Sequence, residues 1–224
     1  MGEKNRDHRI GQFLQEGDTI VCAGEDMVFR ITGDPIGCGG SSVVYPAVLS
    51  SDRRLYAIKE CFPNDPRFCR KNGIVVPADP ADAQALGILG RYRSNLTREA
   101  AIGQIVSNTA TRAVSIQQTL KPLALGHDGQ RYAALEGAMF TVLERMDQKA
   151  VSFDALLAGL VSGYDPEKLR RTRGMPGIHA TAWILEEILI ALKQVHDARD
   201  PEHPGMTGYY YGDLHNGNVY FTEI

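Results

Sequence analysis

An aspartate and an asparagine lie five residues apart in the stretch Tyr211-Gly212-Asp213-Leu214-His215-Asn216-Gly217-Asn218-Val219. The carboxylate of Asp213 can accept a proton from a hydroxyl nucleophile or orient that hydroxyl. The side-chain oxygen of Asn218 can bind a metal ion that also holds phosphate. Asp and Asn are common in plain turns as well. The strand-forming run Val219–Phe221 follows directly, however, and makes a plain turn the weaker interpretation.

A glycine-rich stretch, Ile36-Gly37-Cys38-Gly39-Gly40-Ser41-Ser42-Val43-Val44, joins two segments rich in strand-forming residues. Glycine lets a backbone approach a polyphosphate closely, and the amides of a turn can point at its oxygens. A flexible hairpin without a ligand has the same composition. The following strand, Leu55–Lys59, ends in a lysine on the same face as the small residue Ala57. A lysine in that position suits phosphate binding, although an exposed strand lysine has the same pattern.

A glutamate on a predicted helix is the next candidate. Glu99 lies three residues from both Leu96 and Ile102, so we expect it to share their apolar stripe. A carboxylate on a buried face needs a cationic partner. Lys59 is the partner that we expect, and the alternative is a solvated surface carboxylate.

These residues must be positioned by strands in the first part of the chain and by helices after it. We predict strands at Thr19–Ala23, Val28–Gly37, Ser42–Ser50, Arg54–Phe62, Thr119–Leu125 and Ala138–Met146. We predict helices at Asn95–Ser107, Phe153–Leu160 and Ala180–His196. The stretch from Pro63 to about Gly90 contains four prolines and is expected to be an inserted loop with one or two helical turns near Ala81–Leu89.

The order of these elements predicts an α+β fold with two lobes. The first lobe comprises residues 1–144, is rich in strands, contains one main helix and carries the insertion at about 63–93. The second comprises residues 145–224 and is mainly helical.

Composition excludes several classes of protein. The chain has 24 Lys and Arg against 27 Asp and Glu, whereas nucleic-acid binding normally needs a basic excess. The longest apolar runs, Trp183–Leu185 and Ile188–Leu192, are far shorter than the roughly 20 residues needed to cross a bilayer. Four scattered cysteines without a Cys-x-x-Cys pair argue against a zinc finger and a disulfide scaffold. Because the start of the sequence has no apolar signal core, we expect a cytoplasmic protein.

Together these motifs resemble the protein-kinase-like superfamily from about Val28 to Ile224, and the variant glycine-rich loop looks like those of bacterial Ser/Thr kinases of eukaryotic type. The resemblance implies a bilobal kinase fold with ATP and Mg²⁺ as cofactors. It implies that Lys59 anchors the phosphates and pairs with Glu99. It also implies that Leu143 is the gatekeeper and that the backbone of Glu144 and Met146 binds adenine.

The resemblance assigns the remaining roles by position. The residues implied to contact ATP are Ile36, Gly37, Gly39, Gly40, Ser41, Ser42, Val44, Ala57, Lys59, Glu99, Leu143, Glu144 and Met146. The residues implied to be catalytic are Asp213, Lys59, Asn218 and His215, and Asn218 is also the implied metal ligand.

The catalytic loop departs from the family pattern His-Arg-Asp-Leu-Lys. Tyr211, Gly212 and His215 stand where that pattern has His, Arg and Lys. Without the arginine, the loop lacks the usual basic partner of a phosphorylated activation loop. His215 either contacts the γ-phosphate as a weaker, pH-dependent cation or packs the loop. Gly-Asp-Leu-His with a later Asn also resembles small-molecule phosphotransferases such as aminoglycoside and choline kinases.

We expect an ATP-dependent phosphotransferase, and a Ser/Thr protein kinase is favoured over a kinase of small-molecule alcohols. A pseudokinase that binds nucleotide or a partner without chemistry is the alternative from another class. Because the sequence ends before an Asp-Phe-Gly metal segment, we expect an N-terminal portion with little or no activity by itself. We also expect an exposed apolar face on Ala180–His196, covered by self-association or by the missing C-terminal region. No nucleic-acid or membrane partner is expected.

Overall fold

The structure is a computed structural model. It describes residues 7–22, 27–52, 54–109, 116–120, 122–127, 130–134, 140–144, 151–153, 177–206, 208–209, 214 and 219–221. Contacts within the chain define two compact units. Unit 1 comprises Met1–Gln104 and Ser115–Arg145, and unit 2 comprises Ile105–Val114 and Met146–Ile224.

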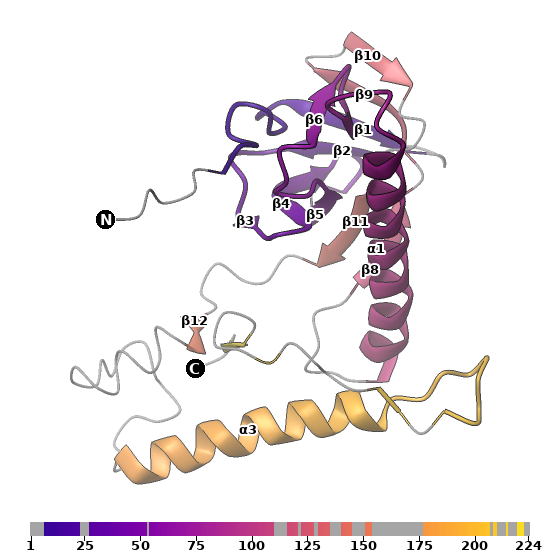
Figure 1. The fold of residues 1–224 in the computed structure, drawn as a ribbon. Helices are drawn as coiled ribbons and strands as arrows, with labels where there is room; N and C mark the ends of the chain where they lie inside the picture. Colours follow the sequence, from indigo (N-terminus) through magenta and orange to yellow (C-terminus); the bar gives the residue numbers. More distant parts are fainter. Residues whose placement is uncertain are drawn as a thin grey trace, which may run out of the picture. The chain divides into compact units, whose positions relative to one another are not determined.

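Unit 1 is built on antiparallel strands (Figure 1). They are β1 (Asp18–Cys22), β2 (Val28–Ile31), β3 (Gly37–Cys38), β4 (Ser42–Leu49), β5 (Leu55–Cys61), β6 (Phe68–Lys71), β7 (Ile74–Pro77), β8 (Ile116–Leu120), β9 (Pro122–His127), β10 (Gln130–Ala134) and β11 (Phe140–Glu144). Among the described residues, one sheet has the order β10-β9-β1-β2-β4-β5-β11-β8, with β3 paired to β4. Strands β6 and β7 form a separate hairpin.

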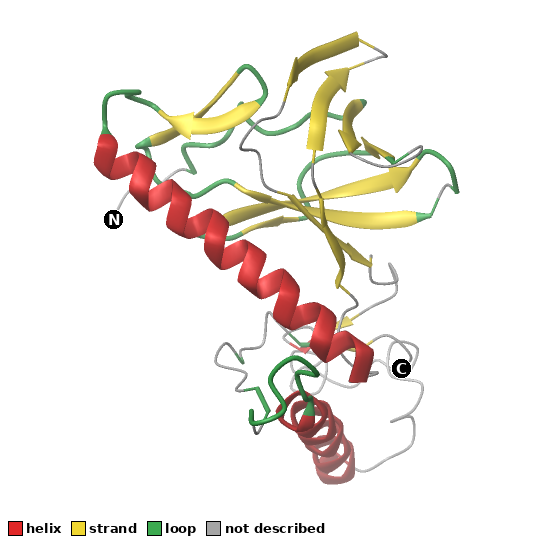
Figure 2. Ribbon diagram, turned by 90° about the vertical axis from the view of Figure 1, so that its right-hand side faces the viewer, coloured by secondary structure: helices red, strands yellow, loops and turns green. Residues whose placement is uncertain are grey.

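Two long helices accompany the strands. Helix α1 (Ala83–Thr109) runs along one side of the strands of unit 1 (Figure 2). Unit 2 contains α3 (Gly177–Asp197) and the paired short strands β12 (Val151–Ser152) and β13 (Tyr220–Phe221). The chain is thus a sheet-rich α+β protein, as the order of the sequence elements predicts.

The core of unit 1 lies on one face of the sheet. Alternate residues of β4, β5 and β11, including Tyr45, Ile58 and Val142, are buried there. Helix α1 adds Leu89 and Leu96 to the same cluster. Burial of each large apolar side chain stabilises the fold by about 1.5–3 kcal/mol. This face of the sheet is therefore the one that packs into the core with helix α1.

The predicted inserted loop is wrong in its middle part, whereas the helical turns predicted near Ala81–Leu89 are present and are continuous with the predicted helix Asn95–Ser107. Its middle part is the hairpin β6–β7, whose turn is Asn72-Gly73 with positive φ at both residues. Asn-Gly favours such two-residue turns because both positions need the left-handed region. Its last part belongs to α1, which begins at Ala83, where the Asp82 carboxylate accepts a hydrogen bond from the Ala85 amide at 2.9 Å. A carboxylate at this position caps a helix.

The other predicted elements agree with the structure to different degrees. Strands predicted at Thr19–Ala23, Ser42–Ser50 and Arg54–Phe62 match β1, β4 and β5 to within a residue or so at each end. The segment predicted as Val28–Gly37 contains β2 and the start of β3, with a turn between them. The predicted helix Phe153–Leu160 lies, apart from Phe153, outside the described residues.

The predicted strand Thr119–Leu125 spans the end of β8 and the start of β9, and the strand predicted at Ala138–Met146 contains β11. The helix predicted at Ala180–His196 is α3, extended at both ends.

Helix α3 exposes apolar side chains. Leu189 is 64% exposed and Leu185 51%, whereas Ile184 on the same helix is buried. The self-association or covering segment expected from this face stays a prediction.

The four cysteines, Cys22, Cys38, Cys61 and Cys69, are free thiols. Burial raises the pKa of Cys22 and of Cys61 to about 11. Both therefore stay protonated at neutral pH. Among the described helices, none combines the length and the apolar character of a bilayer span. The cytoplasmic location stays a prediction.

A buried ion pair lies on the core face of β5. Arg70 donates to Glu60 from Nη1 at 2.8 Å and from Nη2 at 2.6 Å. Glu60, whose side chain is 3% exposed, also accepts a hydrogen bond from the Tyr45 hydroxyl at 3.0 Å. Arg70 further donates to the carbonyls of Gln12 and Gly73 at 2.6 and 2.8 Å. One guanidinium thus ties the hairpin β6–β7 to the sheet and to the N-terminal segment.

Replacing this arginine is expected to destabilise the protein strongly. Arg70→Ala leaves the Glu60 carboxylate buried without a cation, which typically lowers the free energy of unfolding by about 3–5 kcal/mol. Urea unfolding measures the loss. Arg54→Ala is the control because the Arg54 side chain is 77% exposed beside Asp52, and a surface pair contributes roughly 0–1 kcal/mol. Equal losses in the two variants would contradict the assignment.

A second arginine is enclosed near the start of the described chain. Arg9 is completely buried and donates to Asp7 from Nε at 2.9 Å and from Nη2 at 2.6 Å. Hydrogen bonds from the Arg9 side chain hold the pKa of the Asp7 carboxyl below its ordinary value. The folded state therefore favours the ionised form of Asp7.

The Asp7–Arg9 pair is expected to make stability depend on pH. Since the folded-state pKa of Asp7 lies below the unfolded value of about 4, its contribution is complete above that value. It is lost as the pH falls through the lowered folded-state pKa. Asp7→Asn should therefore be less stable than the wild type at neutral pH, and the difference should shrink in acid. Urea unfolding of both proteins from about pH 7 to about pH 3 measures this, and a constant difference would refute it.

Candidate nucleotide-binding site

An ion pair connects strand β5 with helix α1. The Lys59 ammonium donates a hydrogen bond to Oε1 of Glu99. The predicted contact is therefore present. The expectation that Glu99 lies on a buried face is wrong, because its side chain is 52% exposed while that of Lys59 is 19% exposed. Helical periodicity does not explain this exposure, because Val106, seven residues further on and about 20° away around the helix, is buried.

Strand register brings several predicted residues to the same face of the sheet. Lys59 lies opposite Val44 on β4, and Ala57 lies opposite Leu143 on β11. Side chains directly opposite one another share a face, with Cβ atoms about 4.5–5.5 Å apart. Lys59 and Ala57 also share a face because they are two residues apart. This face, opposite to the one that carries Tyr45 and Ile58, holds the candidate site.

The glycine-rich hairpin lies next to Lys59. Its strands β3 and β4 pair Gly37 with Val44, and the Gly39 amide donates to the Ser42 carbonyl at 2.9 Å to close the turn. At the base of the hairpin, the Ile36 amide donates to the Val44 carbonyl at 2.8 Å. The residues predicted to contact phosphate therefore form a tight, ordered turn.

Neither backbone conformation nor packing within the chain explains the glycine at position 40. Gly40 is not among the residues with positive φ, and a Cβ there would meet no atom of the described residues within 4 Å. Where alanine can adopt the same backbone conformation, a glycine lowers the stability by about 0.4–1 kcal/mol, chiefly because it adds conformational entropy to the unfolded chain. Its advantage is the open space above the backbone, which a polyphosphate could occupy. The phosphate-binding role of the hairpin stays a prediction.

One residue of this face escaped the sequence analysis. Thr141 on β11 lies opposite Lys59 and is 2% exposed, and its hydroxyl has no hydrogen-bond partner among the described residues. Buried hydroxyls are usually paired, and an unpaired one is a place where a water or ligand atom can bind. The signal was available, because Thr141 precedes Leu143 by two residues and must share its face.

The remaining predicted site residues have different outcomes. Ile36 and Ser41 are exposed, and Ser42 is buried. Glu144 is the last residue of β11. Met146, Asp213, His215 and Asn218 lie outside the described residues. No cluster of three or more His, Cys, Asp or Glu side chains able to bind a metal occurs in the described part, and the metal role of Asn218 stays a prediction.

Comparison with known proteins gives a structural match alone. No family model and no curated protein sequence matches this chain. A solved structure, the apo form of PpkA-294, a bacterial Ser/Thr kinase fragment, has a TM-score of 0.53 and 16% sequence identity. The match covers 83% of this chain and 52% of PpkA-294, so the chain spans about half the length of the solved chain. At this identity, the likeness shows the fold alone. The fold is kinase-like.

The open space at Gly40 leads to a prediction that separates binding from stability. Gly40→Ala should leave the free energy of unfolding unchanged or raise it by about 0.4–1 kcal/mol, while the added methyl group lowers the affinity for ATP. Urea unfolding and an ATP titration measure the two effects.

Gly73→Ala is the matched control for this variant. Gly73 has a φ of +81°, and a Cβ there would lie 2.8 Å from Leu125 Cδ2, so this variant should be less stable. An unchanged ATP affinity in Gly40→Ala would contradict the phosphate assignment.

Proposed function

We propose that this chain forms the nucleotide-binding part of an ATP-dependent phosphotransferase whose acceptor is a Ser or Thr hydroxyl of a protein. The observation that carries the proposal is the Lys59–Glu99 ion pair, which lies next to the glycine-rich hairpin. A lysine held by a helix glutamate is the arrangement that anchors nucleotide phosphates in kinases. The kinase-like fold supports this interpretation.

The energetics of the ion pair favour a ligand over a structural role. Because Glu99 is half exposed, solvent screens the attraction, and such a pair contributes roughly 0–1 kcal/mol to stability. The Glu60–Arg70 pair on the opposite face is almost completely buried and already holds β5 in place. The Lys59 ammonium is therefore better explained as a cation held ready for an anion than as a support of the fold.

The proposed mechanism gives each described residue a physical task. Lys59 would compensate the negative charge of the phosphates, and Glu99 would hold the ammonium in position. The glycine-rich hairpin would bring backbone amides close to the phosphate oxygens. Fixed charges and dipoles of this kind stabilise the transition state of phosphoryl transfer without reorganising during the reaction.

The apolar part of the same face would bind the base of the nucleotide. Val44, Ala57 and Leu143 present apolar side chains there, and Ala57 is small enough to leave room above it. An apolar surface with a few directed polar groups is the usual form of a ligand pocket. The backbone of Glu144 and Met146 would supply the hydrogen bonds to adenine.

The transfer step itself is assigned from the sequence. Asp213 would orient the acceptor hydroxyl and accept its proton, and His215 would contact the transferred phosphate. Asn218 would hold Mg²⁺, which neutralises phosphate charge when it is bound. An aminoglycoside- or choline-type acceptor is the alternative, because the stretch Gly212-Asp213-Leu214-His215 resembles that of small-molecule kinases.

Loss of the anchoring cation is the test of the proposal. In the complete gene product, Lys59→Ala should lower ATP-dependent phosphoryl transfer by about 10²-fold or more, the usual effect of removing one preorganised donor. Transfer from radiolabelled ATP measures this. Lys193→Ala is the control, because Lys193 also pairs with a carboxylate, Asp197, on the exposed surface of α3.

The acceptors used in this assay decide between the alternatives. Phosphorylation of dephosphorylated casein supports a protein kinase, and phosphorylation of an aminoglycoside or of choline supports a small-molecule kinase. ATP binding without transfer to any of these acceptors, including the protein itself, would identify a pseudokinase. Equal activity of Lys59→Ala and the wild type would overturn the assignment of the site.

A further inference from the structure

The glycine-rich loop is held by groups from outside its own hairpin. The Gly40 carbonyl accepts a hydrogen bond from the Asn64 amide at 2.8 Å, and the Ser42 carbonyl accepts one from Nη1 of Arg9 at 3.2 Å. The Ser42 carbonyl also accepts the hydrogen bond of the Gly39 amide. These contacts use carbonyl oxygens, which do not compete for phosphate. The loop is thus held by its carbonyl oxygens, and the hydrogen bonds from Asn64 and Arg9 leave its backbone amides for a bound phosphate.

Arg9 is the central residue of this arrangement. Its Nη1 donates to the Phe62 carbonyl at 2.6 Å as well as to the Ser42 carbonyl. Ser42 and Cys61 are the last paired residues of the β4–β5 ladder, so Arg9 closes the open end of this ladder. Its other nitrogens bind Asp7, which balances the charge of the buried guanidinium. A buried charge is tolerated only when it is paired and hydrogen-bonded in this way.

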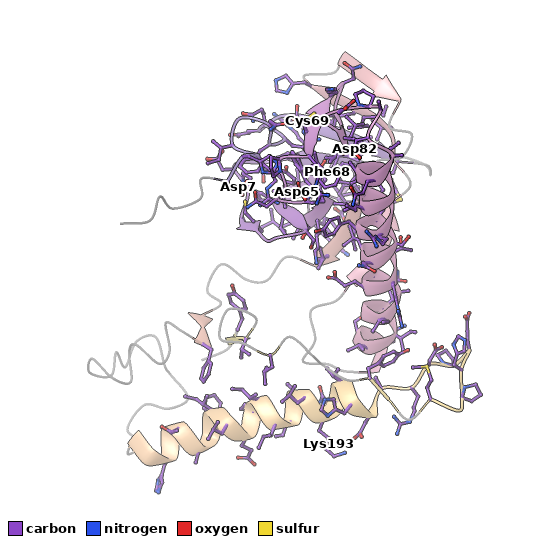
Figure 3. All side chains as sticks on the ribbon, viewed as in Figure 1. Asp7, Asp65, Phe68, Cys69, Asp82 and Lys193 are labelled. Carbon is purple, nitrogen blue, oxygen red and sulfur yellow. The ribbon has the colours of Figure 1, made fainter. Side chains whose placement is uncertain are left out.

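His8 provides a second connection to the same loop. Its Nδ1 lies 2.9 Å from Oδ1 of Asn64, and its Nε2 lies 3.3 Å from the Phe68 carbonyl. Figure 3 labels Asp7 and Phe68 in this part of unit 1. Asn64 is the residue whose amide binds Gly40, so consecutive residues of the N-terminal segment support both contacts to the loop.

We propose that the N-terminal strap, defined as Asp7–Gln12, positions the glycine-rich loop for the phosphates of ATP, with Arg9 as the positioning residue. The inference rests on the proposed function of the loop. Glycine-rich segments lose much conformational entropy when they become ordered. A loop that is ordered before its ligand arrives loses less on binding, and this raises affinity. The strap therefore acts on the affinity for ATP more than on the chemical step.

The chain contains a matched control for Arg9. Asp65 and Arg67 repeat the local geometry of Asp7 and Arg9. The Arg67 amide donates to Oδ1 of Asp65 at 2.9 Å, and the Arg9 amide donates to Oδ1 of Asp7 at 3.0 Å. The Arg67 side chain is 44% exposed, however, and among the described residues it binds Asp65 and no residue of the loop. Arg67→Ala thus removes the same local motif without touching the hairpin.

The experiment compares Arg9→Ala, Arg9→Lys and Arg67→Ala in the complete gene product. Amide hydrogen exchange without nucleotide reports the order of the loop. In Arg9→Ala, the Gly39 and Asn64 amides should exchange about tenfold faster relative to the core amide of Ile58, the effect of losing hydrogen bonds from a charged donor. The KM for ATP should rise about tenfold with a smaller change in kcat.

The remaining variants separate positioning from general destabilisation. Arg9→Lys keeps the charge and part of the donor set, so it should give intermediate values of exchange and KM. Arg67→Ala should match the wild type in both. Unchanged loop exchange in Arg9→Ala overturns the proposal, and so does a KM for ATP that equals that of Arg67→Ala. Failure of the wild type to bind ATP would instead overturn the proposed function. The two failures can be distinguished, because the exchange measurement on the loop needs no nucleotide.

Discussion

Two charged neighbours on strand β5 point to opposite faces of the sheet, and the organisation of unit 1 depends on this alternation. Lys59 faces the candidate site and pairs with Glu99, whereas Glu60 faces the core and pairs with Arg70. Because side chains alternate with a period of two, a shift of one residue in register would exchange them. It would bring Glu60 towards Glu99 and bury Lys59 near Arg70. Like charges would then meet on both faces, so the register is strongly determined.

The same register connects the site to segments distant in sequence. Two arginines, the buried Arg9 and the largely enclosed Arg70, come from outside the main sheet and bind carboxylates together with main-chain carbonyls. Arg70 holds the hairpin β6–β7 on the core side, and Arg9 closes the β4–β5 ladder beside the glycine-rich loop. Guanidinium groups suit this task because their planar donors reach several acceptors at once. The candidate site is therefore supported mainly by segments outside it, the N-terminal strap with Arg9 and the hairpin β6–β7 with Arg70.

Local pattern predicted the parts of the fold that are themselves local. Strands β4 and β5 and the glycine-rich turn followed from strand-forming residues and glycines. The sequence predicted helical turns near Ala81–Leu89 but not their continuity with the helix at Asn95–Ser107, since Gly87 and Gly90 lower helix propensity by about 1 kcal/mol each and prolines precede them. The hairpin β6–β7 was missed although Asn72-Gly73 signals it, because the same prolines favoured a loop. Tertiary contacts, such as those of Arg70, override these weak local preferences.

For the site, the sequence alone determined the residue types and the face of the strand that carries each. Alternation is a property of the backbone, so Lys59 and Ala57 had to share a face in any sheet. The sequence predicted the pairing of Lys59 with Glu99, but the partners of Arg9 came from the tertiary structure alone. Lys59 and Glu99 are 40 residues apart, and Arg9 and Ser42 are 33 apart. Such contacts depend on how α1 and the N-terminal strap pack against the sheet. Periodicity within one helix or strand predicts which residues share a face, but not which other element lies against that face. The exposure of Glu99 and the bracing of the glycine-rich loop therefore emerged only from the folded chain.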